Sequence, residues 1–197
     1  PVSAGSVNLY TREYYELTKQ ALKPGGIVSQ WIPLHSQNET HVYQSYRTFL
    51  ESFPYAMAWY PVNKELILIG SNQPINIDFH SIEERLQSPV IKKIMRDIGF
   101  GTANSFLGSI WFLKNELKGM GSGQRIISDN HPSLEFFHDT ENSISEDDIY
   151  NILRNRTSFE AFWKEITRVS LAKVEKKTFK RYWDSRLAEI DFHYGLV

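Results

Sequence analysis

The chain has 197 residues, of which 41% are hydrophobic and 23% charged, a composition typical of a folded globular domain rather than a disordered segment. The formal net charge of -1 provides no basic field for nucleic acid, so no nucleic-acid partner is expected. Cysteine is absent, which excludes disulfides, thiolate nucleophiles and cysteine zinc sites. Because no secretory signal pattern and no bilayer-length apolar run of roughly 20 residues occurs, a cytoplasmic location is expected.

The first predicted elements are a helix and a buried strand. Thr11 can cap the helix, and residues 23–26 end it, because proline interrupts the hydrogen-bond ladder and glycine accepts a left-handed exit. Residues 27–34 form a short apolar run between turn residues, which is typical of a buried strand. The inner face expected for the helix consists of Tyr10, Tyr14, Leu17 and Ala21.

A second helix and a pair of strands are predicted next. Ser36 or Asn38 can cap the helix, and Pro54 ends it. Residues 56–60 and 65–70 have strand-like composition and are separated by a connection of hairpin length.

The remaining sequence predicts mainly helices. Their expected starts are Pro89, Ser105, Ser145 and a capping box formed by Thr157 and Glu160. The helix from Ser105 is expected to reach Lys118 through an apolar stripe at helical spacing, and residues 125–137 to form a turn-rich segment. The sequence therefore indicates an α/β protein with three segments: a partial sheet domain at 1–80, a helical extension at 81–137 that carries an Asp-Asn-His-Pro loop, and a helical tail at 138–197.

Several motifs together resemble one known family. The first helix opens with Leu-Tyr and ends in Leu-Lys-Pro-Gly-Gly, the following strand carries Gln-Trp-Ile-Pro-Leu, and a later loop reads Ser-Asp-Asn-His-Pro-Ser-Leu-Glu-Phe. These motifs, at 8–17, 22–26, 30–34 and 128–136, together with the strand at 66–71, resemble the spermidine synthase-like (polyamine aminopropyltransferase) family, in particular the branch often fused to membrane segments. The loop departs from the family pattern at Asn130, where an acidic residue is usual, which weakens a role in binding an amine.

This resemblance implies the C-terminal half of a Rossmann-like adenosylmethionine-dependent transferase sheet, with about three strands, followed by a mainly helical tail. In the family's order, the chain would hold the fifth to seventh strands and lack the first four. The glycine-rich turn that binds the nucleotide and the aspartate that deprotonates the amine would lie upstream of Pro1. The chain alone is therefore expected to bind no cofactor or metal and to be inactive.

The implied reaction is aminopropyl transfer from decarboxylated S-adenosylmethionine, a co-substrate of the parent protein, to a diamine. The expected partners are a polyamine substrate and the missing N-terminal half, and the resemblance also allows a homodimer and membrane attachment of the parent.

Five residues are candidate substrate contacts. Gln30 and Trp31 fall near the end of a central strand, where open α/β sheets bind ligands, although Trp31 is equally suited to the core. His35 follows the strand and is either a substrate contact or a hydrogen-bonding loop residue. Asp129 and Glu135 belong to the Asp-Asn-His-Pro loop, for which the alternatives are closure over the substrate and a simple turn.

Two other functions remain open at this stage. One is a methyltransferase of the same fold. The other is a catalytically silent interaction or dimerisation domain, which is suggested by the aromatic residues Phe159, Phe162, Trp163, Phe179, Tyr182 and Trp183.

The resemblance also predicts the strand arrangement. The strand at 65–70 should lie antiparallel beside the strand at 27–34, with the strand at 56–60 outside it. The opposite edge of the strand at 27–34 should have no strand partner, so we expect a helix or a second chain to cover it.

Overall fold

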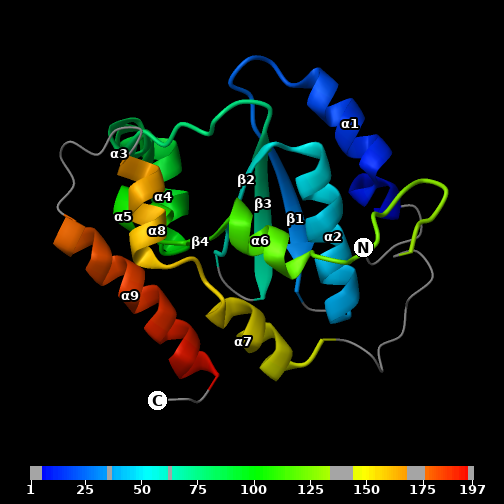
Figure 1. Ribbon diagram of the computed structural model, residues 1–197. Helices are drawn as coiled ribbons and strands as arrows, with labels where there is room; N and C mark the ends of the chain where they lie inside the picture. The colour runs from blue at the N-terminus through cyan, green and yellow to red at the C-terminus, as the bar shows by residue number, and fades with distance from the viewer. Residues whose placement is uncertain (1–5, 35–36, 62–63, 134–143, 168–175, 195–197) are drawn as a thin grey trace. The chain divides into compact units, whose positions relative to one another are not determined.

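The computed structural model describes residues 6–34, 37–61, 64–133, 144–167 and 176–194. In this part of the chain the protein is mixed α/β, with α-helices, one 3-10 helix and a four-stranded sheet (Figure 1). The expected α/β class is therefore confirmed.

The chain forms two compact units, each built from two separate stretches. The first unit comprises Pro1–Ile75 and Phe112–Arg156, and the second comprises Asn76–Trp111 and Thr157–Val197. The three consecutive segments expected from the sequence, 1–80, 81–137 and 138–197, stay a prediction.

The first unit contains most of the sheet, together with helices that lie before, between and after its strands in sequence. Its helical elements are η1 (Ser6–Tyr10), α1 (Arg12–Ala21), α2 (Glu39–Ser52), α6 (Lys114–Met120) and α7 (Glu146–Arg154). Its strands are β1 (Val28–Pro33), β2 (Tyr55–Trp59) and β3 (Glu65–Ser71). The strand β4 (Ile110–Leu113) crosses the boundary between the units.

The sheet has the strand order β1-β3-β2-β4. Both β1 and β2 pair with β3 in antiparallel register, so that Trp31 of β1 and Trp59 of β2 flank Ile67 of β3. The strands β1 and β2 therefore run in the same direction, are connected through α2 and have β3 between them. This confirms the predicted order of the three strands, and β1 is the terminal strand of the described sheet.

The fourth strand corrects a predicted helix. The stretch from Ser105 to Lys118 was expected to be one helix, but α5 (Ala103–Leu107) ends at Gly108, and β4 separates it from α6. Ile110, Trp111 and Phe112 are consecutive and all buried. A surface helix buries only one stripe of its residues, whereas a strand covered on both faces buries every residue in a run.

The buried face of α1 also differs from the prediction. Thr11 caps the helix as expected, since its side chain accepts a hydrogen bond from the Tyr14 backbone N–H. However, Leu17 is 66% exposed and Ala21 is exposed, while Tyr15 is fully buried. The predicted stripe was counted from Tyr10, which belongs to η1, and the extended conformation of Thr11 between the two elements shifts the helical phase.

An aromatic cluster forms the core between α2 and the sheet. Phe49 and Phe53 of α2 lie with ring centroids 4.8 Å apart, and Tyr15 of α1 meets the Phe49 ring edge-on at 5.2 Å. Gly70 of β3 is required at this point, because a Cβ atom there would lie 2.7 Å from Phe49 and 2.8 Å from Phe53. Because β3 has no side chain at Gly70, α2 packs directly on the sheet (Figure 1).

The second unit has its own aromatic core. It contains α3 (Phe79–Gln87), α4 (Pro89–Asp97), α5, α8 (Phe159–Thr167) and α9 (Lys176–His193). Phe162 of α8 packs on Phe179 and Trp183 of α9, with centroid distances of 5.8 Å and 4.3 Å. The aromatic residues that suggested an interaction module are thus largely core residues, although Tyr182 is 40% exposed.

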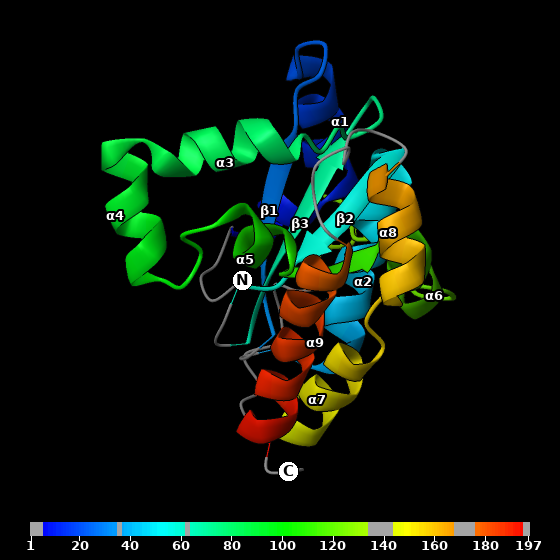
Figure 2. The ribbon, with the colours of Figure 1, turned by 90° about the vertical axis from the view of Figure 1, so that its left-hand side faces the viewer.

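The helix α4 contrasts with that core because none of its residues is buried. It follows α3 directly at Ser88, which is shared as the cap of both helices (Figure 2). None of the helices that the structure describes is both long and apolar enough to cross a membrane.

Candidate functional site

The two substrate contacts predicted on β1, Gln30 and Trp31, lie on opposite faces of the sheet. Gln30 is half-buried and lies opposite Leu68 of β3, whereas Trp31 is 43% exposed and lies opposite Ile67. Successive side chains of a strand alternate between faces. A pocket on one face of the sheet can therefore contact only one of these two side chains.

Tyr10 connects η1 to this strand. Its hydroxyl donates a 2.9 Å hydrogen bond to the backbone carbonyl of Trp31, and the Gln30 side-chain amide donates to the same oxygen at 3.2 Å. Burial raises the pKa of the Tyr10 hydroxyl, and a side-chain hydrogen bond with Gln30 partly offsets this rise. One backbone carbonyl at the edge of β1 is thus bonded by side chains of its own unit, one of which comes from the helical element η1. The covering of the rest of this edge by a helix or a second chain stays a prediction.

Asp129 lies in a tight turn next to the start of α1. The turn is closed by a hydrogen bond from the His131 backbone N–H to the Ser128 carbonyl, and Asp129 is exposed. The backbone N–H of Asp129 donates to Glu13 Oε2 at 3.1 Å. Within the described residues its carboxylate has no hydrogen-bond or ion-pair partner, so it is accessible to a ligand.

Glu13 places a second carboxylate at this turn. Desolvation tends to raise its pKa, but hydrogen bonds from its own backbone N–H and that of Asp129, together with the Arg12 guanidinium, outweigh this effect and lower the pKa. Glu13 is therefore ionised at neutral pH. The turn is further held by a 2.9 Å hydrogen bond from the Arg12 backbone N–H to the Ile127 carbonyl.

The junction of η1 and α1 thus contacts both regions in which substrate contacts were predicted, the strand β1 and the turn at Asp129. Tyr10 contacts β1, and Arg12 and Glu13 contact the turn that contains Asp129. The exposed carboxylate of Asp129 and the half-buried carboxylate of Glu13 can attract a protonated amine. His35 and Glu135 fall outside the described residues. Among the described residues no group of three or more histidine, aspartate or glutamate side chains could hold a metal ion.

Two residues of this junction were not predicted to have these roles. Tyr10 was assigned to the inner face of a helix, and Glu13 was part of the family-like opening of that helix. The only local signal was the position of Glu13 in the first turn, where a carboxylate suits the helix dipole. Their contacts join positions 21 and 116 residues apart in sequence, which no local pattern can reveal.

Comparisons of this chain with protein-family models, curated protein sequences and solved structures find no match. The functional proposals therefore depend on the sequence motifs, the strand order and the geometry of the residues.

Proposed function

We propose that this chain is the C-terminal part of a spermidine synthase-like aminopropyltransferase and forms one wall of its diamine pocket. In this proposal an N-terminal half supplies the first strands of the sheet, the nucleotide site and the catalytic aspartate. The edge of β1 that has no strand partner among the described residues would receive the neighbouring parallel strand, which would replace the hydrogen bonds of Tyr10 and Gln30 to the Trp31 carbonyl. The sequence motifs of α1, β1 and the Asp129 turn support the family, and Gln30, Asp129 and Glu13 are the wall residues of this chain.

The strand order β1-β3-β2 is the observation that carries the proposal. An antiparallel strand inserted between two strands of the same direction is an unusual arrangement, because consecutive strands are usually neighbours in space. The resemblance implied this order for the fifth, seventh and sixth strands of an adenosylmethionine-dependent fold. Direct pairing of β1 with β2, as in a meander of consecutive antiparallel strands, would have counted against the proposal.

The proposed chemistry is a nucleophilic substitution at carbon. An uncharged amine nitrogen of the diamine attacks the aminopropyl carbon bound to sulfur, a C–N bond forms, and the C–S bond breaks with its electron pair going to sulfur. The products are a neutral thioether nucleoside and a longer polyamine, and the amine proton passes to a carboxylate. Asp129 and Glu13 would attract the charged diamine rather than take part in the bond changes.

A methyltransferase is the second candidate, because the same strand order suits any transferase of this fold. Assay of the full-length gene product distinguishes the two. We expect decarboxylated S-adenosylmethionine plus putrescine to give spermidine and methylthioadenosine, detected by mass spectrometry. Formation of S-adenosylhomocysteine from S-adenosylmethionine would favour methyl transfer, and the absence of both products would favour a catalytically silent domain.

A further inference from the structure

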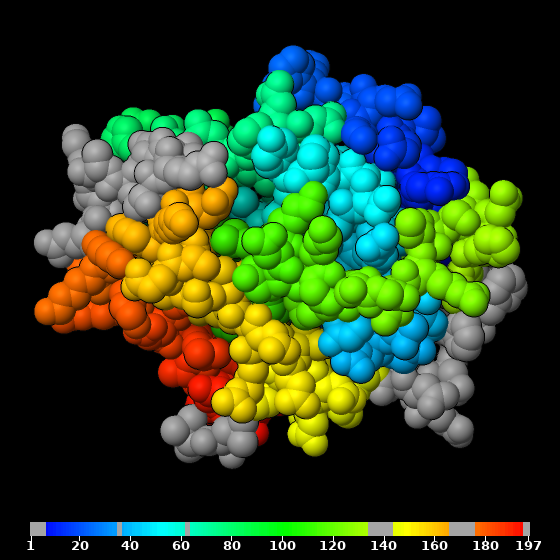
Figure 3. Space-filling view, in the orientation of Figure 1, coloured from blue at the N-terminus to red at the C-terminus, as the bar shows by residue number. Residues whose placement is uncertain are grey.

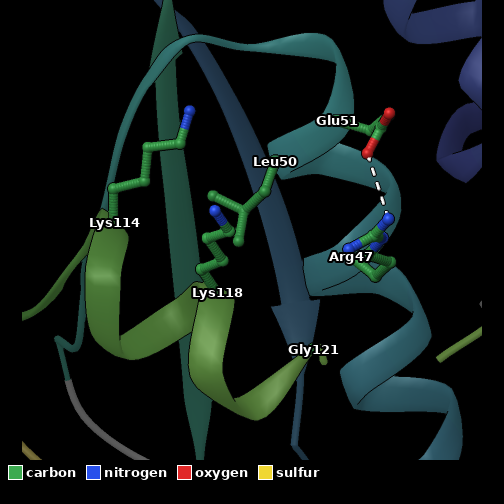
Figure 4. A pocket seen from close by; sticks show the side chains of 6 residues that line it. All are labelled: Arg47, Leu50, Glu51, Lys114, Lys118 and Gly121. Carbon is green, nitrogen blue, oxygen red and sulfur yellow. Dashed lines mark ion pairs between the residues drawn. The ribbon is translucent and has the colours of Figure 1, made fainter. Parts of the chain in front are cut away.

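A groove separate from the η1–α1 junction lies between α2 and α6. Arg47, Leu50 and Glu51 of α2 line one side of it, and α6 with its C-cap lines the other (Figure 4). The residues on that second side are Lys114, Lys118 and Gly121. Both helices reach the surface on the same face of the first unit (Figure 3). The groove encloses about 550 Å³, including space open to solvent.

The close approach of the two helices depends on Gly121. A Cβ atom at this position would lie 3.2 Å from the backbone nitrogen of Arg47 and 3.3 Å from its Cα. The shape of the groove therefore follows from helix packing, because the backbone at the end of α6 lies against the middle of α2.

The groove gathers positive charge. Arg47, Lys114 and Lys118 contribute three cations and Glu51 one anion, which leaves a net charge of +2 from these four side chains. Glu51 forms an ion pair with Arg47 at 3.4 Å. Lys118 is exposed and has no ion pair or hydrogen bond within the described residues, and its side chain is directed toward Leu50 (Figure 4).

Two of these cations repel each other. Lys114 and Lys118 are four residues apart on α6, where like charges are unfavourable. Desolvation and then the charge of Lys118 lower the pKa of Lys114. Violations of local electrostatic rules of this kind concentrate at functional sites.

Part of the groove is held rigidly. Lys114 Nζ donates hydrogen bonds to the carbonyls of Phe53 and Pro54, at 3.1 Å and 2.7 Å, which fixes its ammonium at the C-terminal end of α2. The site therefore combines a positioned ammonium, a guanidinium that is paired with Glu51, and an exposed lysine without a partner among the described residues.

We propose that this groove binds the phosphate group of a small phosphate monoester. A monoester carries a charge near -2 at neutral pH, which matches the +2 of the groove, and arginine matches the geometry of phosphate oxygens. The buried side chain of Leu50 provides an apolar wall for the organic part of the ester. This binding requires neither the nucleotide nor the diamine of the proposed transferase.

Titration of the ¹⁵N-labelled chain with inorganic phosphate and with glycerol 3-phosphate, at constant ionic strength, tests the proposal. We expect saturable NMR shifts of α2 and α6 amides, with tighter binding of the ester. Lys118→Ala should weaken binding by about tenfold, and Glu51→Gln should strengthen it severalfold because it removes the competing anion. Lys19→Ala is the control and should leave the affinity unchanged, because Lys19 is a half-buried lysine of α1 outside the groove.

Each outcome of this titration is decisive. Equal binding of both probes, with the expected variant effects, would retain the phosphate site but overturn the role of Leu50. No saturation by either probe at millimolar concentration would overturn the site. Saturation that responds to neither Lys118→Ala nor Glu51→Gln would place the binding elsewhere on the protein and overturn it as well. Because Glu51→Gln is expected to improve binding, unfolding of a variant cannot imitate the predicted result.

Discussion

The η1–α1 junction contains a buried tyrosine, Tyr10, and a charged residue, Glu13. Tyr10 is 4% exposed and bonds to the edge strand, whereas Glu13 is half-buried and bonds to the turn at Asp129. A net hydrogen bond contributes on the order of 1 kcal/mol to folding, and a surface charge contributes less. The first contact is therefore expected to affect stability, and the second mainly the local structure of the turn.

Replacement of Tyr10 by phenylalanine tests the first contact. We expect Tyr10→Phe to lower the free energy of unfolding by about 1 kcal/mol, because the Trp31 carbonyl loses its 2.9 Å donor while the ring stays in place. Urea denaturation measures the change. Tyr182→Phe on α9, where the ring is 40% exposed, is the control and should change stability by less than about 0.5 kcal/mol.

The lowered pKa of Glu13 gives a prediction about pH. A carboxyl with a lowered pKa in the folded state stabilises its contacts above its ordinary pKa of 4.5, and these contacts are lost as pH falls through the lower folded value. The amide resonance of Asp129 should therefore shift in acid with the titration of Glu13. In Glu13→Gln this shift should disappear; its persistence would mean that another group controls the turn.

Asp129 tests the proposed transferase in the full-length enzyme. If its exposed carboxylate attracts the diamine, Asp129→Asn should raise the diamine KM by roughly tenfold while nucleotide affinity stays unchanged. Steady-state kinetics with both substrates varied measures this. An unchanged KM would show that Asp129 serves only the turn.

At the scale of elements, the packing of α2 on β3 depends on the absence of a side chain at Gly70. Phe49 and Phe53 are fully buried, and their rings occupy the position that a Cβ atom of residue 70 would need. Because a close-packed core has little free volume, neither ring can move far without disturbing Tyr15.

We therefore expect Gly70→Ala to lower the free energy of unfolding by about 1–3 kcal/mol, the usual cost of overpacking a core. The matched control is Gly119→Ala in α6, where a Cβ atom would meet nothing within 4 Å. That variant should gain about 0.5–1 kcal/mol, because alanine favours a helix over glycine. Thermal or urea unfolding of both variants provides the comparison, and equal effects would contradict the packing argument.

At the scale of the whole molecule, two compact units each have their own aromatic core. Phe49, Phe53 and Tyr15 belong to the first, and Phe162 and Trp183 to the second. Units with separate cores can open separately.

Truncation of the fully buried Phe162 tests this division. We expect Phe162→Ala to destabilise the second unit by about 3–5 kcal/mol. Hydrogen exchange should then show faster exchange of amides in α8 and α9, while those of β3 and α2 keep their protection. Uniform loss of protection through both units would instead indicate a single cooperative fold.

The sequence by itself determined where several of the helices begin. The caps Thr11 and Ser145 were predicted, and Asn38 was one of two predicted alternatives. Each accepts a hydrogen bond from a backbone N–H three residues on. Pro89 likewise starts a helix as expected. Such signals are readable because the interacting groups are separated by one helical turn, so their geometry follows from the residue types alone.

Only the tertiary structure decided which surfaces are buried and which distant residues meet. The run from Ile110 forms a strand because both its faces are covered, and Leu17 is exposed because the core contacts Tyr15 instead. The contacts from Tyr10 to β1 and from Glu13 to Asp129 likewise depend on packing between segments far apart in sequence. Burial is a non-local property, and its free energy outweighs the small intrinsic preference of a short segment for helix or strand.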